Sequence, residues 1–74
     1  MLGNKIKALR ALEGLNQLQF ASQIGISQTH LSQIEMNKKK PSLELLILIA
    51  RRFNRSLDDL VQEDANFPEA RASG

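Results

Sequence analysis

Apolar residues recur at helical spacing along most of the chain. Ile6, Leu9 and Leu12 lie three positions apart with lysine and arginine between them, which predicts a helix over residues 3–13. Gly14 suits the left-handed residue that ends a helix. Similar patterns predict four more helices, each preceded by a side chain that can cap a first turn. These capping residues are Asn16, Ser27, Ser42 and Ser56.

The expected helix ends complete this outline. The second helix stops at Gly25, the third runs over residues 28–36, the fourth ends near Phe53 and the fifth is short. Asn37 can close the third helix in the left-handed conformation. No stretch alternates as a strand does, so we expect an all-α, compact five-helix domain over residues 1–62. A short, acidic and flexible tail is expected over residues 63–74.

Composition excludes several classes of site. The 74 residues include no cysteine and one histidine, which rules out disulfides and thiolate metal sites, and we expect no metal and no cofactor. The longest apolar run, residues 45–50, is far shorter than the roughly 20 residues of a membrane span. No secretion signal is visible at the N-terminus. We therefore expect a cytoplasmic protein with no membrane partner.

The net charge of +2 hides an uneven distribution. Residues 1–55 carry nine basic and three acidic side chains, whereas residues 56–74 carry one basic and five acidic ones. A basic body with an acidic tail is typical of a protein that meets a polyanion on one face. Charge alone is also compatible with an ordinary solvated surface.

The segment from Gln17 to Met36 has the features of two helices crossing at a steep angle. Ala21 is small where the two backbones would approach, and Gly25 can take the positive φ that a tight turn needs. Apolar residues of both predicted helices point to one side. A short glycine-containing turn between two such helices is the helix-turn-helix arrangement.

Residues 5–61 resemble the phage-repressor helix-turn-helix family, typified by lambda repressor and Cro. The matching pieces include Gly25-Ile26-Ser27, Ile34-Glu35, Pro41-Ser42-Leu43, Ile49-Ala50 and Ser56-Leu57-Asp58. The resemblance implies that helix 28–36 lies in the major groove of double-stranded DNA. It also implies an ion pair between Arg10 and Glu35 that braces the first helix against the third.

Two departures from the family pattern stand out. Asn37 occupies a position that is commonly glycine in the family. Four leucines occupy positions that are usually polar, and we expect them to be exposed: Leu12, Leu18, Leu45 and Leu48.

With the third helix in the major groove, some polar residues are expected to contact bases and others to contact phosphates. In this geometry the start of the recognition helix meets base edges, and glutamine can pair with adenine while a threonine methyl packs on thymine. The expected base readers are Gln28, Thr29, Ser32 and Gln33. The expected phosphate contacts are Asn16, Gln17, His30, Lys38, Lys39 and Lys40.

One recognition helix reads only a few base pairs, so discrimination within a genome favours a homodimer on a two-fold operator. Apolar residues outside the expected core are the candidates for its interface: Leu45, Leu48, Leu60, Val61 and Phe67. We expect no small-molecule effector.

Other functions fit the sequence less well. Ser27 and His30 share one short helix without an acidic partner, and no glycine-rich phosphate loop occurs, so no enzyme is expected. The sequence therefore predicts a sequence-specific DNA-binding transcriptional regulator, a repressor or controller. The main alternative is an antitoxin or adaptor that uses the same fold to bind protein.

Overall fold

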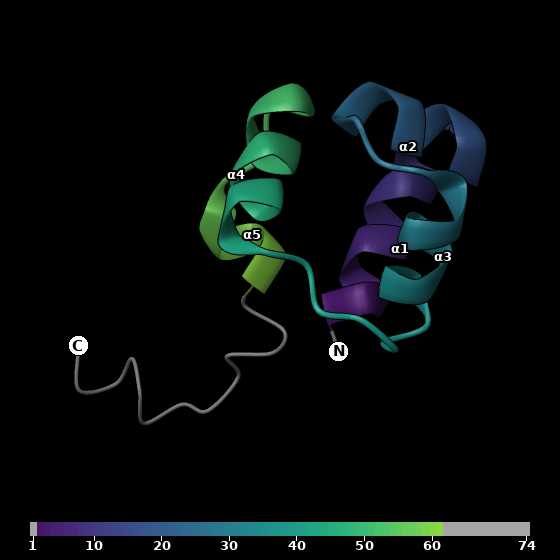
Figure 1. Cartoon of the computed structure of the whole chain (residues 1–74). Helices are drawn as coiled ribbons and strands as arrows, with labels where there is room; N and C mark the ends of the chain where they lie inside the picture. Colours follow the sequence, from purple (N-terminus) through teal and green to yellow (C-terminus); the bar gives the residue numbers. More distant parts are fainter. Residues whose placement is uncertain (1, 62–74) are drawn as a thin grey trace.

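The computed structural model describes residues 2–61, without the side chain of Val61, and these residues form five helices (Figure 1). They are α1 (Leu2–Leu12), α2 (Gln17–Ile24), α3 (Gln28–Glu35), α4 (Leu43–Arg52) and α5 (Leu57–Val61). Within this range there is no strand, which confirms the expected all-α five-helix class. The expected tail over residues 63–74, including Phe67, lies outside the described residues.

Helices α2 to α5 each begin directly after their predicted capping residue. Asn16 Oδ1 accepts a hydrogen bond of 2.7 Å from the Gln19 N–H, and Gln19 Oε1 accepts one of 3.0 Å from the Asn16 N–H. This reciprocal pair is a capping box. The hydroxyls of Ser27, Ser42 and Ser56 each accept from the backbone N–H three residues later.

The first four helices each end at a left-handed residue. These residues are Gly14, Gly25, Asn37 and Asn54, with φ between 56° and 76°. After each one, the next backbone N–H bonds back to a carbonyl five residues earlier, as in a Schellman motif. Asn54 was not predicted to play this part. Four short turns of the same kind allow five helices to fold within sixty residues.

The core lies where α1, α2 and α3 meet α4 and α5. Figure 1 shows α4 and α5 on one side of the molecule and the first three helices on the other. Phe20 of α2 is fully buried, and its ring stacks on that of Phe53 with centroids 4.8 Å apart. Ile6, Leu31, Ile34 and Ile49 are also almost fully buried. This packing attaches α4 firmly to the helix-turn-helix segment.

Two leucines expected on the surface are buried instead. Leu45 is 9% exposed and Leu60 is 2% exposed, and both belong to the core. The cause is that α4 contacts both α2 and α5, while α5 contacts both α1 and α4. Each helix therefore buries a wider face than one neighbour would cover, and these two residues are not available to a partner. Leu12, Leu18 and Leu48 are exposed as expected.

The start of α1 lies against the end of α3. The Gly3 N–H donates to Asn37 Oδ1 at 2.9 Å, which satisfies one of the unpaired donors at a helix N-terminus. A Cβ atom on Gly3 would overlap the Ile34 carbonyl oxygen and come within 2.9 Å of that of Glu35. Only glycine allows α1 to approach the backbone of α3 so closely.

Gly3→Ala is expected to lower the free energy of unfolding by about 1–3 kcal/mol, because backbone atoms must move to admit the methyl group. This loss outweighs the gain of up to about 1 kcal/mol in helix propensity. Urea denaturation followed by circular dichroism measures the change. Lys7→Ala, at an exposed position of the same helix, should stay within about 0.5 kcal/mol of the parent. An unchanged or higher stability for Gly3→Ala would contradict this account of the α1–α3 contact.

Candidate nucleic-acid interface

Helix α3 has two chemically different faces. Leu31 and Ile34 are each 1% exposed and face the core. Gln28 and Thr29 are exposed on the other side, and the next turn, with Ser32 and Gln33, is half-buried. The face that points away from the core is therefore polar and uncharged, and it is rich in groups that both donate and accept hydrogen bonds.

The polar face of α3 forms part of one shallow surface depression. It is lined by Gln17, Gln28, Thr29, Ser32, Gln33, Met36 and Lys38. The structure thus brings together all four expected base readers and two of the six residues expected to contact phosphate. Met36 was not predicted, although it lies three positions after Gln33 and four after Ser32, on the same side of the helix.

The turn between α2 and α3 positions this face. Gly25 has a φ of 76°, and the Ile26 N–H donates back to the Ala21 carbonyl at 3.0 Å. Ala21 is 1% exposed and Ile26 packs against the core. The Ser27 hydroxyl then caps α3 by accepting from the His30 N–H at 3.0 Å. The turn is closed on both sides, so the direction of α3 relative to α2 is well defined.

The carboxylate of Glu35 joins the first three helices. The expected ion pair with Arg10 is present: Arg10 Nε lies 2.7 Å from Glu35 Oε2 and Arg10 Nη2 lies 3.1 Å from Oε1. Gln17 Nε2 also donates to Oε1, at 3.0 Å. Arg10 Nη1 donates to the Leu15 carbonyl at 3.0 Å. The Glu35 side chain is 3% exposed, so these partners take the place of water around its carboxylate.

This network holds Gln17 at the border of the depression. One N–H of its amide points to Glu35, which leaves the second N–H as a donor. The backbone N–H groups at the start of α2 lie at the positive end of that helix, where an anion binds favourably. Asn16 uses its Oδ1 for capping, and its own Nδ2 is a further donor at this end.

The three consecutive lysines do not share one location. Lys38 lines the depression, whereas Lys40 and His30 line a separate hollow near the start of α4. Lys39 is exposed and lines neither. The backbone N–H groups of Lys38 and Lys39 both donate to the Gln33 carbonyl, which curls this loop back toward the end of α3. Lys38 is therefore the one lysine of the three that borders the polar face of α3.

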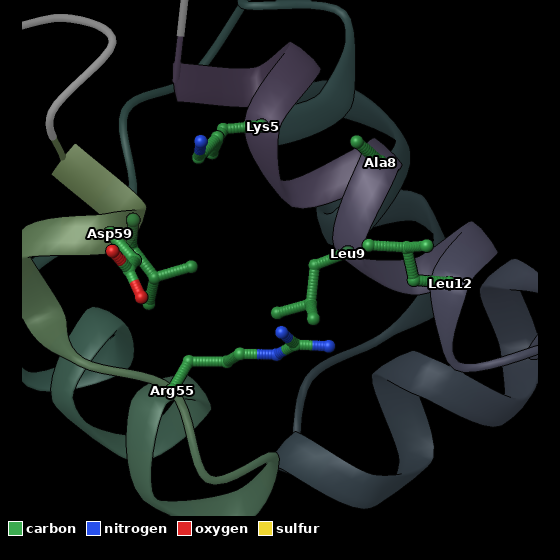
Figure 2. Close-up of a pocket in the computed structure, with 7 residues that line it drawn as sticks. Lys5, Ala8, Leu9, Leu12, Arg55 and Asp59 are labelled. Carbon is green, nitrogen blue, oxygen red and sulfur yellow. The ribbon is translucent and has the colours of Figure 1, made fainter.

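A third hollow lies between α1 and α5 (Figure 2). Leu9 and Leu12 project into it from α1, and Arg55 and Asp59 border its other wall. Its volume of about 190 Å³ is below the roughly 300–1,000 Å³ of a typical small-molecule site. Residues 2–61 hold no group of three histidine or carboxylate side chains suited to a metal ion. Nor do they include a helix that could cross a membrane.

Comparisons with known proteins agree on the type of domain. The sequence profile described as helix-turn-helix matches residues 6–60. An uncharacterized HTH-type transcriptional regulator of Methanocaldococcus jannaschii is 39% identical over 62 residues, covering 82% of this chain and 94% of that protein. The crystal structure of the clp gene regulator ClgR from C. glutamicum superposes with a TM-score of 0.77 at 29% identity, covering 88% of this chain and 84% of that one.

Two other relatives are longer proteins. Antitoxin PezA of Streptococcus pneumoniae is 44% identical over 64 residues, covering 86% of this chain and 40% of the antitoxin. The immunity repressor protein of Bacillus phage phi105 is 31% identical over 71 residues, covering 96% of this chain and 49% of the repressor. This chain therefore spans less than half the length of either relative.

Removal of the Glu35 carboxylate should destabilise the domain strongly. Glu35→Ala leaves the guanidinium of Arg10, which is 16% exposed, without its compensating charge, and about 3 kcal/mol of unfolding free energy should be lost. Arg55→Ala is the matched control, because Arg55 and Glu13 form an exposed ion pair at 3.3 Å that contributes about 0–1 kcal/mol. Urea denaturation compares the two. Equal losses in the two variants would contradict the role assigned to Glu35.

Proposed function

Because the chain belongs to the phage-repressor-like helix-turn-helix family, we propose that it is a transcriptional regulator, a repressor or controller, that binds a specific double-stranded DNA sequence. One observation carries the proposal. Gln28, Thr29, Ser32 and Gln33 lie together on the face of α3 that the core leaves open. A helix with a rigid support and a polar, uncharged outer face has the width and chemistry to enter the major groove.

Base recognition is assigned to the first turns of α3. Gln28 and Gln33 carry amides that can donate to N7 and accept from N6 of adenine in one bidentate contact. The Thr29 methyl can pack against the methyl group of thymine, and the Ser32 hydroxyl can pair with either kind of edge. These uncharged side chains bind phosphate weakly, so the binding free energy that they add depends on which bases they meet.

Phosphate contacts are assigned to the two borders of the depression. On one side are the start of α2 and the side chains of Asn16 and Gln17. On the other side is Lys38, with the exposed Lys39 next to it in the chain and with His30 and Lys40 at the separate hollow near the start of α4. These contacts would fix the position of α3 in the groove without adding sequence information.

A homodimer on a two-fold operator completes the proposal. The recognition face of one domain spans only a few base pairs, and two half-sites about 34–36 Å apart would double the sequence that is read. The exposed position of Leu48 is compatible with an interface, whereas the burial of Leu45 and Leu60 removes them as candidates. For Val61 and Phe67 the assignment remains a prediction from sequence.

An antitoxin is the second candidate, favoured by the 44% identity with antitoxin PezA. In that case this domain would supply the DNA-binding part, and a toxin would bind elsewhere. Co-expression with a toxin encoded beside the gene, followed by purification of a complex, would favour the antitoxin. DNA binding through α3 is expected for both candidates.

Selection from a random duplex pool should enrich one sequence motif, and Gln33→Ala should alter it. The loss of one bidentate contact should cost about 1–3 kcal/mol on the selected sequence and relax the preference at one base pair. Fluorescence anisotropy on the selected duplex and its single-base variants measures both effects. Gln23→Ala, at an exposed position near the end of α2, is the matched control and should leave affinity and preference unchanged. An equal loss of affinity for every duplex after Gln33→Ala would contradict its assignment as a base reader.

Lys39→Ala should weaken binding to all duplexes alike. Loss of one phosphate contact should reduce the slope of log K against log salt by about 0.9 while the selected motif stays the same. Titrations at several salt concentrations measure the slope. Lys7→Ala, which removes an exposed charge from α1, should leave the slope as it is. An unchanged slope after Lys39→Ala would show that this lysine does not contact phosphate.

A further inference from the structure

The outer face of α4 carries three of the six large apolar side chains that are exposed among residues 2–61, and none of the three is a proposed DNA contact. Leu43, Ile47 and Leu48 are 62%, 36% and 44% exposed. Leu43 and Ile47 lie on the side of α4 away from the buried Leu45 and Ile49, whereas Leu48 lies at the border of the exposed side, next to Leu45. Leu48 also borders the hollow that Ile26 and Leu45 line, so the apolar surface continues toward the turn between α2 and α3. Several neighbouring exposed aliphatic residues on so small a domain indicate a contact surface.

Charged residues are placed symmetrically about this face. Glu44 precedes Ile47 by three positions and Arg51 follows Leu48 by three, so the two charges are equally distant from the midpoint between Ile47 and Leu48. All four residues lie on the exposed half of the helix. Within residues 2–61 no ion pair joins Glu44 or Arg51 to another side chain. The helix is thus acidic at one end of the face, apolar in the middle and basic at the other end.

We infer that α4 is the dimer interface, and that two copies pair antiparallel with Ile47 and Leu48 of each chain at the two-fold axis. In that arrangement Glu44 of each copy lies opposite Arg51 of the other, so both ends of the contact carry an ion pair. A parallel pairing would put Glu44 against Glu44 and Arg51 against Arg51. A two-fold interface must be self-complementary, and the antiparallel arrangement satisfies this condition while the parallel one violates it.

The size of the contact sets its strength. A helix of ten residues is about 15 Å long, so two such helices bury less surface than the roughly 1,200–2,000 Å² of a stable interface. The dimer is therefore weak in solution and forms mainly when two copies bind adjacent half-sites of DNA. Binding to one duplex raises their effective concentration to the millimolar range.

Charges at these positions have a second effect within one chain. Glu44 near the start of α4 and Arg51 near its end also suit the helix dipole, so each reversal destabilises the helix slightly. The dipole acts within each copy and cannot be repaired by adding another copy. An experiment that mixes two variants separates the two effects.

Charge reversal in separate copies tests the antiparallel pairing. In a homodimer of Glu44→Arg, two positive charges meet at each end of the contact, and in one of Arg51→Glu two negative charges meet. In a mixed dimer of the two variants, opposite charges meet at both ends. Sedimentation equilibrium at millimolar protein should show a dimer for the parent. The association constant of the dimer should be about tenfold lower for each variant alone, and the equimolar mixture should return close to the parental value.

Two controls accompany the mixture. Lys7→Glu reverses an exposed charge on α1 and should not weaken the dimer. Leu48→Ser should weaken the dimer, whereas Leu12→Ser, at a leucine that is 75% exposed on α1, should not. Circular dichroism of each variant verifies the fold. A mixture no more dimeric than its components, or a parent that is monomeric at millimolar concentration, would overturn the inference.

The inference rests on the proposed dimer, but sedimentation needs no DNA, so the two can fail separately. If the parent selects a DNA motif through α3 while mixing restores nothing, only the α4 interface is wrong. If the mixture dimerises while no motif is enriched, the interface stands and the proposed function falls.

Discussion

The orientation of α3 about its own axis, which decides which of its side chains face the core, is the constraint on which the rest of the domain depends. Burial of Leu31 and Ile34 turns one side of this short helix into the core, and Glu35 locks the setting by bonding to Arg10 and Gln17. A rotation of one residue, about 100°, would bury Gln28 and expose Ile34 in one direction, or bury Gln33 and expose Leu31 in the other. The apolar contacts supply most of the stabilisation, and the ion pair adds a geometric requirement. The same contacts that fold the domain therefore decide which side chains it offers to a groove.

Most of the architecture could be predicted because the local signals are strong and agree with one another. Asn and Ser side chains stand before four helices, and residues that tolerate positive φ follow three of the predicted helix ends. These signals act over a few residues and need no knowledge of the tertiary fold. The cluster of Gln28, Thr29, Ser32 and Gln33 was likewise predictable, since helical periodicity places them on the side opposite Leu31 and Ile34.

Features that depend on contacts between distant segments were missed. Leu45 and Leu60 are buried because α4 and α5 each have two neighbours, a fact that the sequence of one helix does not contain. Asn37 was expected only to end α3, but its side chain also caps Gly3 of α1, 34 positions away. Because Leu45 is buried, the apolar residues of α4 that remain exposed near its middle are Ile47 and Leu48, with Glu44 and Arg51 beside them. The base-reading face then lies on α3 and the surface for a second copy on α4, and the two surfaces adjoin at the hollow that His30, Lys40, Glu44 and Leu48 line.

The most direct test of the central claim is an NMR measurement of contacts between the domain and its selected duplex. The account predicts intermolecular NOEs from the Thr29 methyl and from the side-chain amides of Gln28 and Gln33 to protons of the major groove, including thymine methyl groups. It also predicts that the core methyls of Leu31 and Ile34 keep their positions in the complex. NOEs confined to other helices, with the three α3 side chains unaffected by DNA, would contradict it.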